Sequence, residues 1–406
     1  MTTLTDPPQG SFKVSMLLND TRYRSYTFQF IALILLIAAF AYLGSNLAYN
    51  LAEAGLNISY GFLGEPAGYD INQRLIEYTS QSSHWDATIV GVLNTLLVAF
   101  LACVTATILG VIAGVLRLSN NWLISKLMSI YVEAFRNVPV LIWIIIIFTV
   151  ITAVLPGARA YLGEDPDVDL TLGMFAFTNR GIYIPAPVLG SGGMAVVVIL
   201  LASIMAMFAY RSYAKKLLFN TGRLLPMAWP SVAILILPAV IAFYVLGQPI
   251  TLDTPDPLAN RFNLRGGIQI GAPLIALWFA LAIYTGAFIA ENVRAGIQAV
   301  SKGQTEAAAS LGLRPNRVMN LVVLPQALRV IIPPLISQYL NITKNSSLAI
   351  AVGYADITAT LGGITLNQTG RAIESVLLLM LFYLVISLSI STVMNLYNRA
   401  VSLKER

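Results

Sequence analysis

The chain has 406 residues, of which 57% are hydrophobic and only 11% are charged, and its mean hydropathy is +0.74. Soluble domains carry about 25% charged residues, so this composition excludes an ordinary soluble protein and indicates an integral membrane protein. One cysteine, Cys103, and one histidine, His84, exclude a disulfide framework and metal sites built from several such side chains, and we expect no metal or cofactor. The net charge of +6 is typical of basic anchoring at the cytoplasmic face of a membrane, rather than of nucleic-acid binding.

Eight apolar stretches have about the 20 residues that a helix needs to cross a bilayer. In chain order they are residues 28–48, 89–116, 138–155, 194–210, 227–246, 270–290, 330–352 and 373–396. In the second stretch, Gly91, Gly110 and Gly114 would let another helix approach closely, because glycine has no side chain. We therefore predict an all-α integral membrane protein with about eight transmembrane helices.

The basic residues are unevenly divided between the two sides of these helices. With eight crossings and a cytoplasmic N-terminus, 18 Lys and Arg residues fall on the cytoplasmic side and seven on the opposite side. This distribution fits the excess of positive charge that cytoplasmic loops carry in membrane proteins. It predicts that both termini and the loop of residues 291–329 lie in the cytoplasm.

That loop contains the signals of a short polar helix. Ser301 followed by Gln304 matches a capping box, and Thr305–Leu311 can form about two helical turns with small residues on one face. Gly312 stands where a helix C-terminus favours a residue in the left-handed conformation. A small-residue face on a cytoplasmic helix suits a groove on another protein, although the helix signals alone favour an ordinary loop helix.

The same loop resembles the signature loop of binding-protein-dependent ABC importer permeases. The resemblance is carried by Glu306-Ala307-Ala308, Gly312 and Leu324-Pro325 at the family's spacing, with Val322 where isoleucine is commoner. Five further segments resemble the polar amino-acid (histidine/glutamine-type) subfamily: Ala290–Ile297, Pro325–Arg329, Lys344–Leu348, Asn94–Leu96 and Glu133–Pro139. Asn137-Val138 departs from the Gly-Thr of the last segment, so its position carries over but its detailed contacts do not. The chain is most similar to the larger permease subunit of proteobacterial general L-amino-acid importers.

The resemblance implies a permease subunit of an ATP-driven importer for polar or general L-amino acids. The chain contains no Gly-x-x-x-x-Gly-Lys-(Ser/Thr) phosphate loop, so we expect it not to be an enzyme and ATP to be hydrolysed by a separate dimer of ATP-binding subunits. Residues 301–325 would couple the permease to that dimer through Glu306, Ala307, Ala308, Gly312, Leu324 and Pro325. The other implied partners are a related second permease in a heterodimer, a periplasmic amino-acid-binding protein and the lipid of a bacterial inner membrane.

The resemblance also implies a five-helix importer-permease core plus three added helices. The expected segments are an N-terminal cytoplasmic tail (1–27), an added first helix with a periplasmic segment (28–87), the first part of the core (88–155), an insertion with two transmembrane helices and periplasmic loops (156–269), the second part of the core (270–400) with the coupling loop 291–329, and a C-terminal cytoplasmic tail (401–406).

Polar residues in the seventh stretch are candidates for the substrate path. They are Lys344, Asn345, Ser346 and Ser347, and Pro333-Pro334 are expected to break the helix nearby. A charged side chain within an apolar span usually marks a pathway or an ion pair, and a lysine with neighbouring hydroxyls suits an α-carboxylate. Lys344 could equally lie at the outer interface, with its charged end in water, or pair with an acidic residue.

Three further polar features have structural interpretations. Glu291 and Arg294 stand three residues apart and are expected to form an ion pair at the membrane edge, and Glu133 and Arg136 have the same spacing. His84 is expected to anchor the chain at the membrane interface.

The alternative function is an ion-coupled secondary amino-acid transporter. Such proteins usually show inverted repeats and acidic residues inside their spans, whereas the stretches here carry few acidic residues beyond edge positions such as Glu291 and Glu374. A membrane enzyme is disfavoured because His, Cys and buried Asp or Glu, which acid–base and metal chemistry need, are scarce.

Overall fold

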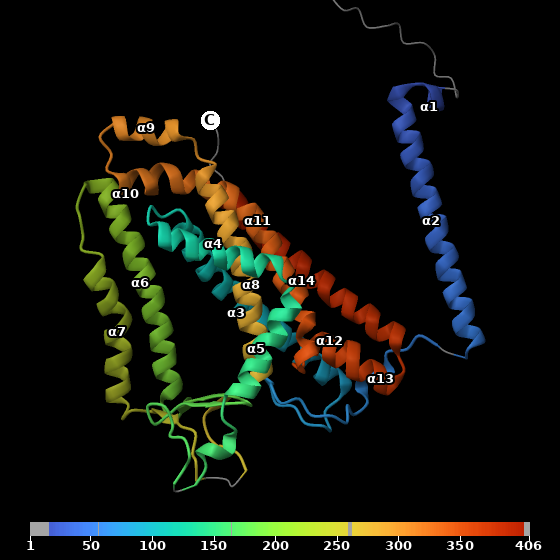
Figure 1. Ribbon diagram of the computed structural model, residues 1–406, viewed down its shortest axis with the longest axis horizontal. Helices are drawn as coiled ribbons and strands as arrows, with labels where there is room; N and C mark the ends of the chain where they lie inside the picture. Colours follow the sequence, from blue (N-terminus) through green and yellow to red (C-terminus); the bar gives the residue numbers. More distant parts are fainter. Residues whose placement is uncertain (1–15, 56, 164, 259–261, 402–406) are drawn as a thin grey trace, which may run out of the picture. The chain divides into compact units, whose positions relative to one another are not determined.

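A computed structural model of the chain describes residues 16–55, 57–163, 165–258 and 262–401 (Figure 1). The chain divides into two units, Met1–Gly61 and Phe62–Arg406. The described part is mostly helical, as predicted, and seven of its helices are long and apolar enough to cross a membrane, or up to eight if one bent pair forms a single span. Most of the expected N-terminal tail and residues 402–406 of the expected C-terminal tail lie outside the described residues.

The first unit consists of α1 (Met16–Asn19) and α2 (Thr21–Glu53). Helix α2 contains the first predicted span and exposes its apolar side chains along its length, as a helix surrounded by lipid would.

The remaining elements begin with a short 3-10 turn, η1 (Gly61–Gly64). They continue with α3 (His84–Arg117), α4 (Trp122–Asn137), α5 (Val140–Val154), η2 (Ala158–Tyr161), β1 (Ala176–Thr178), β2 (Gly181–Ile184), β3 (Ala186–Leu189), α6 (Gly193–Thr221), α7 (Ala228–Val245), β4 (Ile250–Asp253), β5 (Ile268–Gly271), α8 (Ala272–Gln298), α9 (Lys302–Ser310), α10 (Pro315–Val318), η3 (Met319–Val323), α11 (Leu324–Asn345), η4 (Ser346–Val352), α12 (Ile357–Ala359), η5 (Thr360–Thr365), α13 (Leu366–Thr369) and α14 (Ala372–Val401).

Helices α3 and α8 pack closely along their length and form the centre of the core. A Cβ atom at Gly110 would lie 2.5 Å from Ile289 Cβ, and one at Gly114 would lie 2.6 Å from the carbonyl oxygen of Ala290. Only glycine allows the two backbones to approach this closely, so the predicted close approach is confirmed. Gly91 serves the same purpose against the connecting segment, where a Cβ would lie 2.2 Å from Thr360 Oγ1.

Helices α4 and α5 are bent by 106° relative to each other. The backbone of Val138 is extended (φ −111°, ψ 133°) and ends α4. The cause is Pro139, because a proline disfavours the helical conformation of the residue before it. The rings of Phe135 and Trp143 stack across the bend with centroids 4.1 Å apart. The sequence predicted a span at 138–155 and did not predict α4 as a separate helix.

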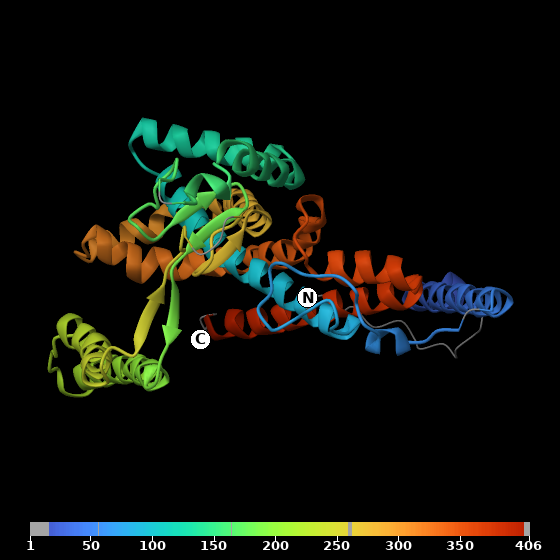
Figure 2. The ribbon, with the colours of Figure 1, turned by 90° about the horizontal axis from the view of Figure 1, so that it is seen from below.

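The predicted insertion, residues 156–269, contains more than two helices and loops. Helices α6 and α7 form a hairpin, and short strands form a three-stranded sheet in the order β1-β2-β5 and a two-stranded ribbon of β3 and β4, all antiparallel. Figure 2 shows the ribbon running from the three-stranded sheet to the helical hairpin. Strands of three or four residues leave little periodicity in a sequence, which is why these segments were predicted as loops.

Helix α11 continues through Pro333 and Pro334, so the predicted break at these residues is wrong. Prolines are tolerated inside membrane helices where neighbouring structure compensates for the lost hydrogen bonds, and α11 packs against both α8 and α14. The chain then forms the 3-10 turn η4 and a connecting segment, residues 353–371, that contains α12, η5 and α13.

Candidate functional site

The loop between α8 and α11 folds into the short helix that its sequence predicted. Figure 1 shows α9 beside α10, at the end of the unit opposite to the small sheets. Ser301 is the N-cap as predicted, but its side chain makes no capping hydrogen bond, and the helix begins at Lys302 rather than Thr305. Gly312 has φ +77°, which confirms the left-handed residue expected after the helix.

Helix α9 has one buried side and one free side. Ala308 is 6% exposed and packs in an apolar cluster with Val318. Glu306 and Ala307 are exposed, and Leu311, at the end of the helix, is 82% exposed. The exposed side of α9 thus carries an acidic group and a leucine, while the buried side holds the helix on the rest of the chain. Such a surface is suited to contact another protein.

Leu324 and Pro325, the second half of the motif, lie in the first turn of α11. The π-helical turn η3 runs directly into α11, so Pro325 lies within a continuous helical run just after a local widening of the helix. The apolar cluster below α9 also includes Ile297 of α8 and Val323 immediately before α11. A force applied to α9 would therefore reach two core helices, α8 and α11.

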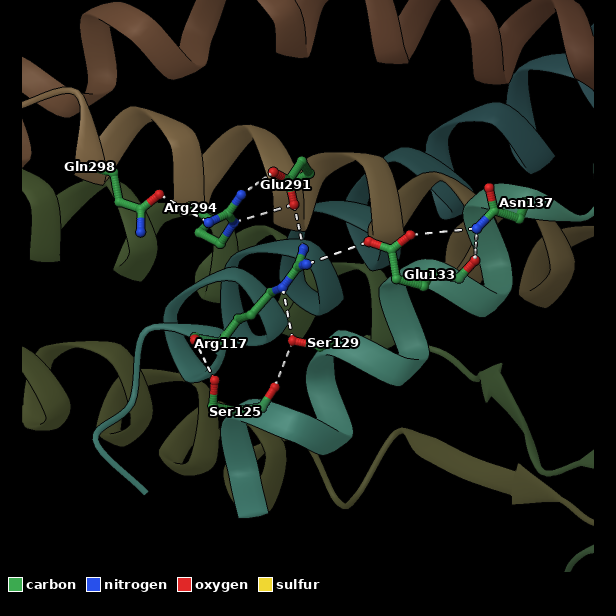
Figure 3. A network of polar contacts seen from close by, with 8 residues as sticks. All are labelled: Arg117, Ser125, Ser129, Glu133, Asn137, Glu291, Arg294 and Gln298. Atoms are coloured by element: carbon green, nitrogen blue, oxygen red, sulfur yellow. Dashed lines mark hydrogen bonds and ion pairs between the residues drawn. The ribbon is translucent and has the colours of Figure 1, made fainter. Parts of the chain in front are cut away.

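A network of charged side chains joins α3, α4 and α8 (Figure 3). The Arg117 guanidinium donates to Glu291 through Nη1, lies 3.5 Å from a Glu133 carboxylate oxygen through Nη2, and donates to Ser129 Oγ at 3.1 Å through Nε. Arg294 donates to the other Glu291 oxygen at 2.6 Å, which confirms the predicted Glu291–Arg294 ion pair. With only 14% of its side chain exposed, Arg117 ties the ends of three helices together.

The predicted ion pair between Glu133 and Arg136 is wrong. Glu133 turns to Arg117, whereas the Arg136 guanidinium lies 5.3 Å from the ring centroid of Phe288 on α8. Sequence spacing identified which residues share a helix face, but the competing partner Arg117 comes from another helix.

The four candidate residues of the substrate path lie where α11 passes into η4. Lys344 is exposed, and its backbone carbonyl accepts a hydrogen bond from Ser347 Oγ at 2.8 Å. Ser346 is fully buried and donates to the Thr343 carbonyl at 2.7 Å, while Asn345 is half-buried. The two serine hydroxyls are thus engaged with backbone, and the Lys344 ammonium is the group with freedom to meet a solute.

A buried polar cluster, which the sequence did not predict, fastens α3 to the connecting segment. The Asn94 side-chain amide donates to the backbone carbonyls of Gln73 and Ala355 at 2.7 and 2.9 Å, and the Asn94 backbone carbonyl accepts from the Tyr354 hydroxyl at 3.1 Å. Next to it, Asp356 is 0% exposed and accepts from the Ala359 N–H at 2.8 Å as the cap of α12. Burial raises the pKa of the Asp356 carboxyl to about 6.

His84 is a packed residue and not an interfacial anchor, so that prediction is wrong. The residue is 3% exposed, and its Nδ1 lies 3.0 Å from Thr365 Oγ1. It fixes the start of α3 to η5, and the neighbouring Trp85 is the exposed aromatic side chain at 50%.

The model of the family described as "Binding-protein-dependent transport system inner membrane component" matches residues 198–403. The glutamate/glutamine/aspartate/asparagine transport system permease protein BztB of Rhodobacter capsulatus is 47% identical over 100% of both chains. The general L-amino acid transport system permease protein AapQ of Rhizobium johnstonii is 43% identical over 98% of this chain and 96% of its own.

The chain belongs to this family of transport-system membrane components. It is a non-enzymatic, multi-pass permease of an ABC transport system, a class that implies an ATPase partner and a solute-binding protein. The relatives give no support to the ion-coupled alternative. A solved amino acid ABC transporter with histidines matches 78% of this chain and 95% of its own at 21% identity, with a TM-score of 0.45.

Proposed function

We propose that this chain is the permease subunit of an ATP-driven importer for polar L-amino acids in a bacterial inner membrane, with both termini in the cytoplasm. The observation that carries the proposal is the full-length similarity to two permeases whose names specify amino-acid transport. A related second permease would complete the path, and a periplasmic amino-acid-binding protein would deliver the solute.

In this proposal α9 is the contact with the ATP-hydrolysing subunit. The exposed Glu306, Ala307 and Leu311 would meet that subunit, while the buried Ala308 holds the helix on the permease. Closure of two ATPase subunits would move α9, and the packed base of the loop would pass the motion to α8 and α11. Gly312 would set the angle of the helix, because its φ of +77° disfavours any residue with a side chain.

Reconstitution tests the function as a whole. The chain, assembled in proteoliposomes with its second permease, ATPase and binding protein, should take up L-glutamine or L-glutamate only when ATP is present. Uptake by the permease alone, driven by an ion gradient, would overturn the proposal in favour of a secondary transporter.

Two glycines of the coupling loop provide a matched test of α9. A Cβ has open space at both Gly303 and Gly312, but only Gly312 has a positive φ. Gly312→Ala should therefore reduce uptake and stimulation of the ATPase, whereas Gly303→Ala should leave both unchanged. Glu306→Lys should weaken ATPase binding with the permease still folded. Equal uptake by all three variants would refute the role of α9.

The role of Lys344 in the path is a separate part of the proposal. Its exposed ammonium could attract an α-carboxylate, so Lys344→Ala should lower the rate of amino-acid uptake without loss of folded protein. If uptake is unchanged, Lys344 is not part of the substrate path, and the alternative interpretation, a lysine at the outer membrane interface, holds.

A further inference from the structure

The second unit contains an open cavity of about 970 Å³ with both polar and apolar side chains in its lining. One part of its wall comes from core segments and the segment before α3, and includes Asp70, Thr152 and Asn367. Another part comes from the insertion, residues 156–269, and includes Asn179, Arg180 and Gln269. Sites for small molecules have volumes of about 300–1,000 Å³, so the cavity has room for an amino acid with water.

Arg180 is held on this wall by a turn whose backbone is fixed on both sides. Thr178 Oγ1 donates to the carbonyl of Gly181 at 2.8 Å and accepts from the Arg180 N–H at 3.2 Å. The Arg180 carbonyl accepts from the N–H of Ala272, the first residue of α8, at 3.0 Å. A Cβ at Gly181 would lie 2.1 Å from the Ile270 carbonyl oxygen, so the turn lies directly against β5.

The Arg180 guanidinium makes no hydrogen bond or ion pair with any residue that the structure describes. Arg117 and Arg294 differ, because their guanidinium groups are held by Glu291. Arg180 thus lines the cavity from a fixed backbone turn, with its guanidinium donors unpaired. Asp70 lines the same cavity from the segment before α3; it is exposed, and its carboxylate also has no partner among the described residues.

We propose that this cavity receives an amino acid in its zwitterionic form, with Arg180 binding the α-carboxylate and Asp70 available for the α-ammonium group. This inference rests on the proposed function and assigns part of the solute site to the insertion. A guanidinium offers two parallel N–H donors that match the two oxygens of a carboxylate. The ammonium group of a lysine has no such planar pair of donors. The amides of Asn179, Gln269 and Asn367 can bind a polar side chain of the solute.

The test compares Arg180→Gln with Arg180→Lys and with Arg159→Gln. Arg159 is an exposed arginine of the same insertion that does not line the cavity. Each variant is assembled in proteoliposomes with the second permease, ATPase and binding protein, and three quantities are measured: uptake of L-glutamine, basal ATP hydrolysis and affinity for the loaded binding protein. We expect Arg180→Gln to lower L-glutamine uptake at least tenfold, with unchanged basal ATP hydrolysis and unchanged affinity for the binding protein. Arg180→Lys should recover part of the lost uptake. Arg159→Gln should match wild type in all three quantities.

Other outcomes overturn the inference in distinguishable ways. If wild type imports L-glutamine and Arg180→Gln imports it equally well, the cavity assignment is wrong and the proposed function stands. If Arg180→Gln loses affinity for the binding protein in parallel with uptake, Arg180 is a docking residue and not a solute-binding one. If the wild-type assembly imports no amino acid with ATP, the proposed function itself fails.

Discussion

Asp356→Asn is expected to change the stability of the permease in a pH-dependent way. The Asp356 side chain is 0% exposed, and its Oδ2 has no hydrogen-bond partner within the described residues, so the ionised form is poorly solvated. Burial raises its pKa from 3.8 to about 6. A shift of about two pKa units corresponds to about 3 kcal/mol of free energy of unfolding.

The sign follows from which state binds the proton more tightly. Because the pKa of Asp356 is higher in the folded protein than in the unfolded chain, protonation favours folding, and this stabilisation is complete below about pH 4 and lost as the pH rises through about 6. Asparagine cannot ionise in this range and caps a helix as well as aspartate does. The variant should therefore be more stable than wild type at neutral pH, by up to about 3 kcal/mol, with the difference shrinking toward about pH 4.

The assay is unfolding of the detergent-purified chain, followed by tryptophan fluorescence at a series of pH values. Asp167→Asn is the control, because Asp167 is exposed in the insertion and the same chemical change there removes no buried charge. The reasoning is refuted if Asp356→Asn differs from wild type by the same amount at every pH. It is also refuted if the variant is the less stable protein at neutral pH.

Three further predictions concern packing, the ion network and coupling. Gly110→Ala should destabilise the protein by about 1–3 kcal/mol through the contact with α8, whereas Gly44→Ala, whose Cβ meets nothing within 4 Å, should be neutral or slightly stabilising; chemical denaturation measures both. Glu291→Gln should lower the free energy of unfolding by roughly 2 kcal/mol, seen as a lower midpoint temperature of thermal unfolding, because the neutral amide keeps one acceptor oxygen for the two guanidinium groups that the carboxylate now binds. Leu311→Ser should weaken binding of the ATPase at least several-fold, which a pull-down with the ATPase measures. It should change the free energy of unfolding by less than about 0.5 kcal/mol, because Leu311 is 82% exposed.

Hydropathy was sufficient to predict where the long helices lie. Each of the eight apolar stretches falls largely within a helix or, for the seventh, within α11 and η4. The glycines of α3 were also informative, because a small residue repeated on one face of an apolar helix has few other uses. Gly312 was predicted correctly because the requirement for a left-handed residue is local.

Partners across long sequence distances were not predictable in the same way. Arg117 and Glu291 are 174 residues apart, and no periodicity indicates that their helices meet at these two positions. The same applies to Asn94, whose amide reaches Ala355 across 261 residues, and to His84, whose burial depends on a segment near the other end of the chain. A helical pattern identifies a face, whereas its partner is decided by tertiary packing.

The insertion also shows why a boundary drawn from resemblance differs from a structural one. The sequence places the insertion at 156–269 and the second part of the core from 270, yet β5 spans that boundary and continues directly into α8. Strand β2 of the insertion pairs with β5, with Gly181 opposite Gly271, so the inserted segment is bonded to the first residues of a core helix. A change in the position of α8 during transport would move Arg180 with it, because the Arg180 carbonyl is bonded to the N–H of Ala272. The insertion is therefore mechanically part of the core, which is why substitutions within it are expected to alter transport and not only stability.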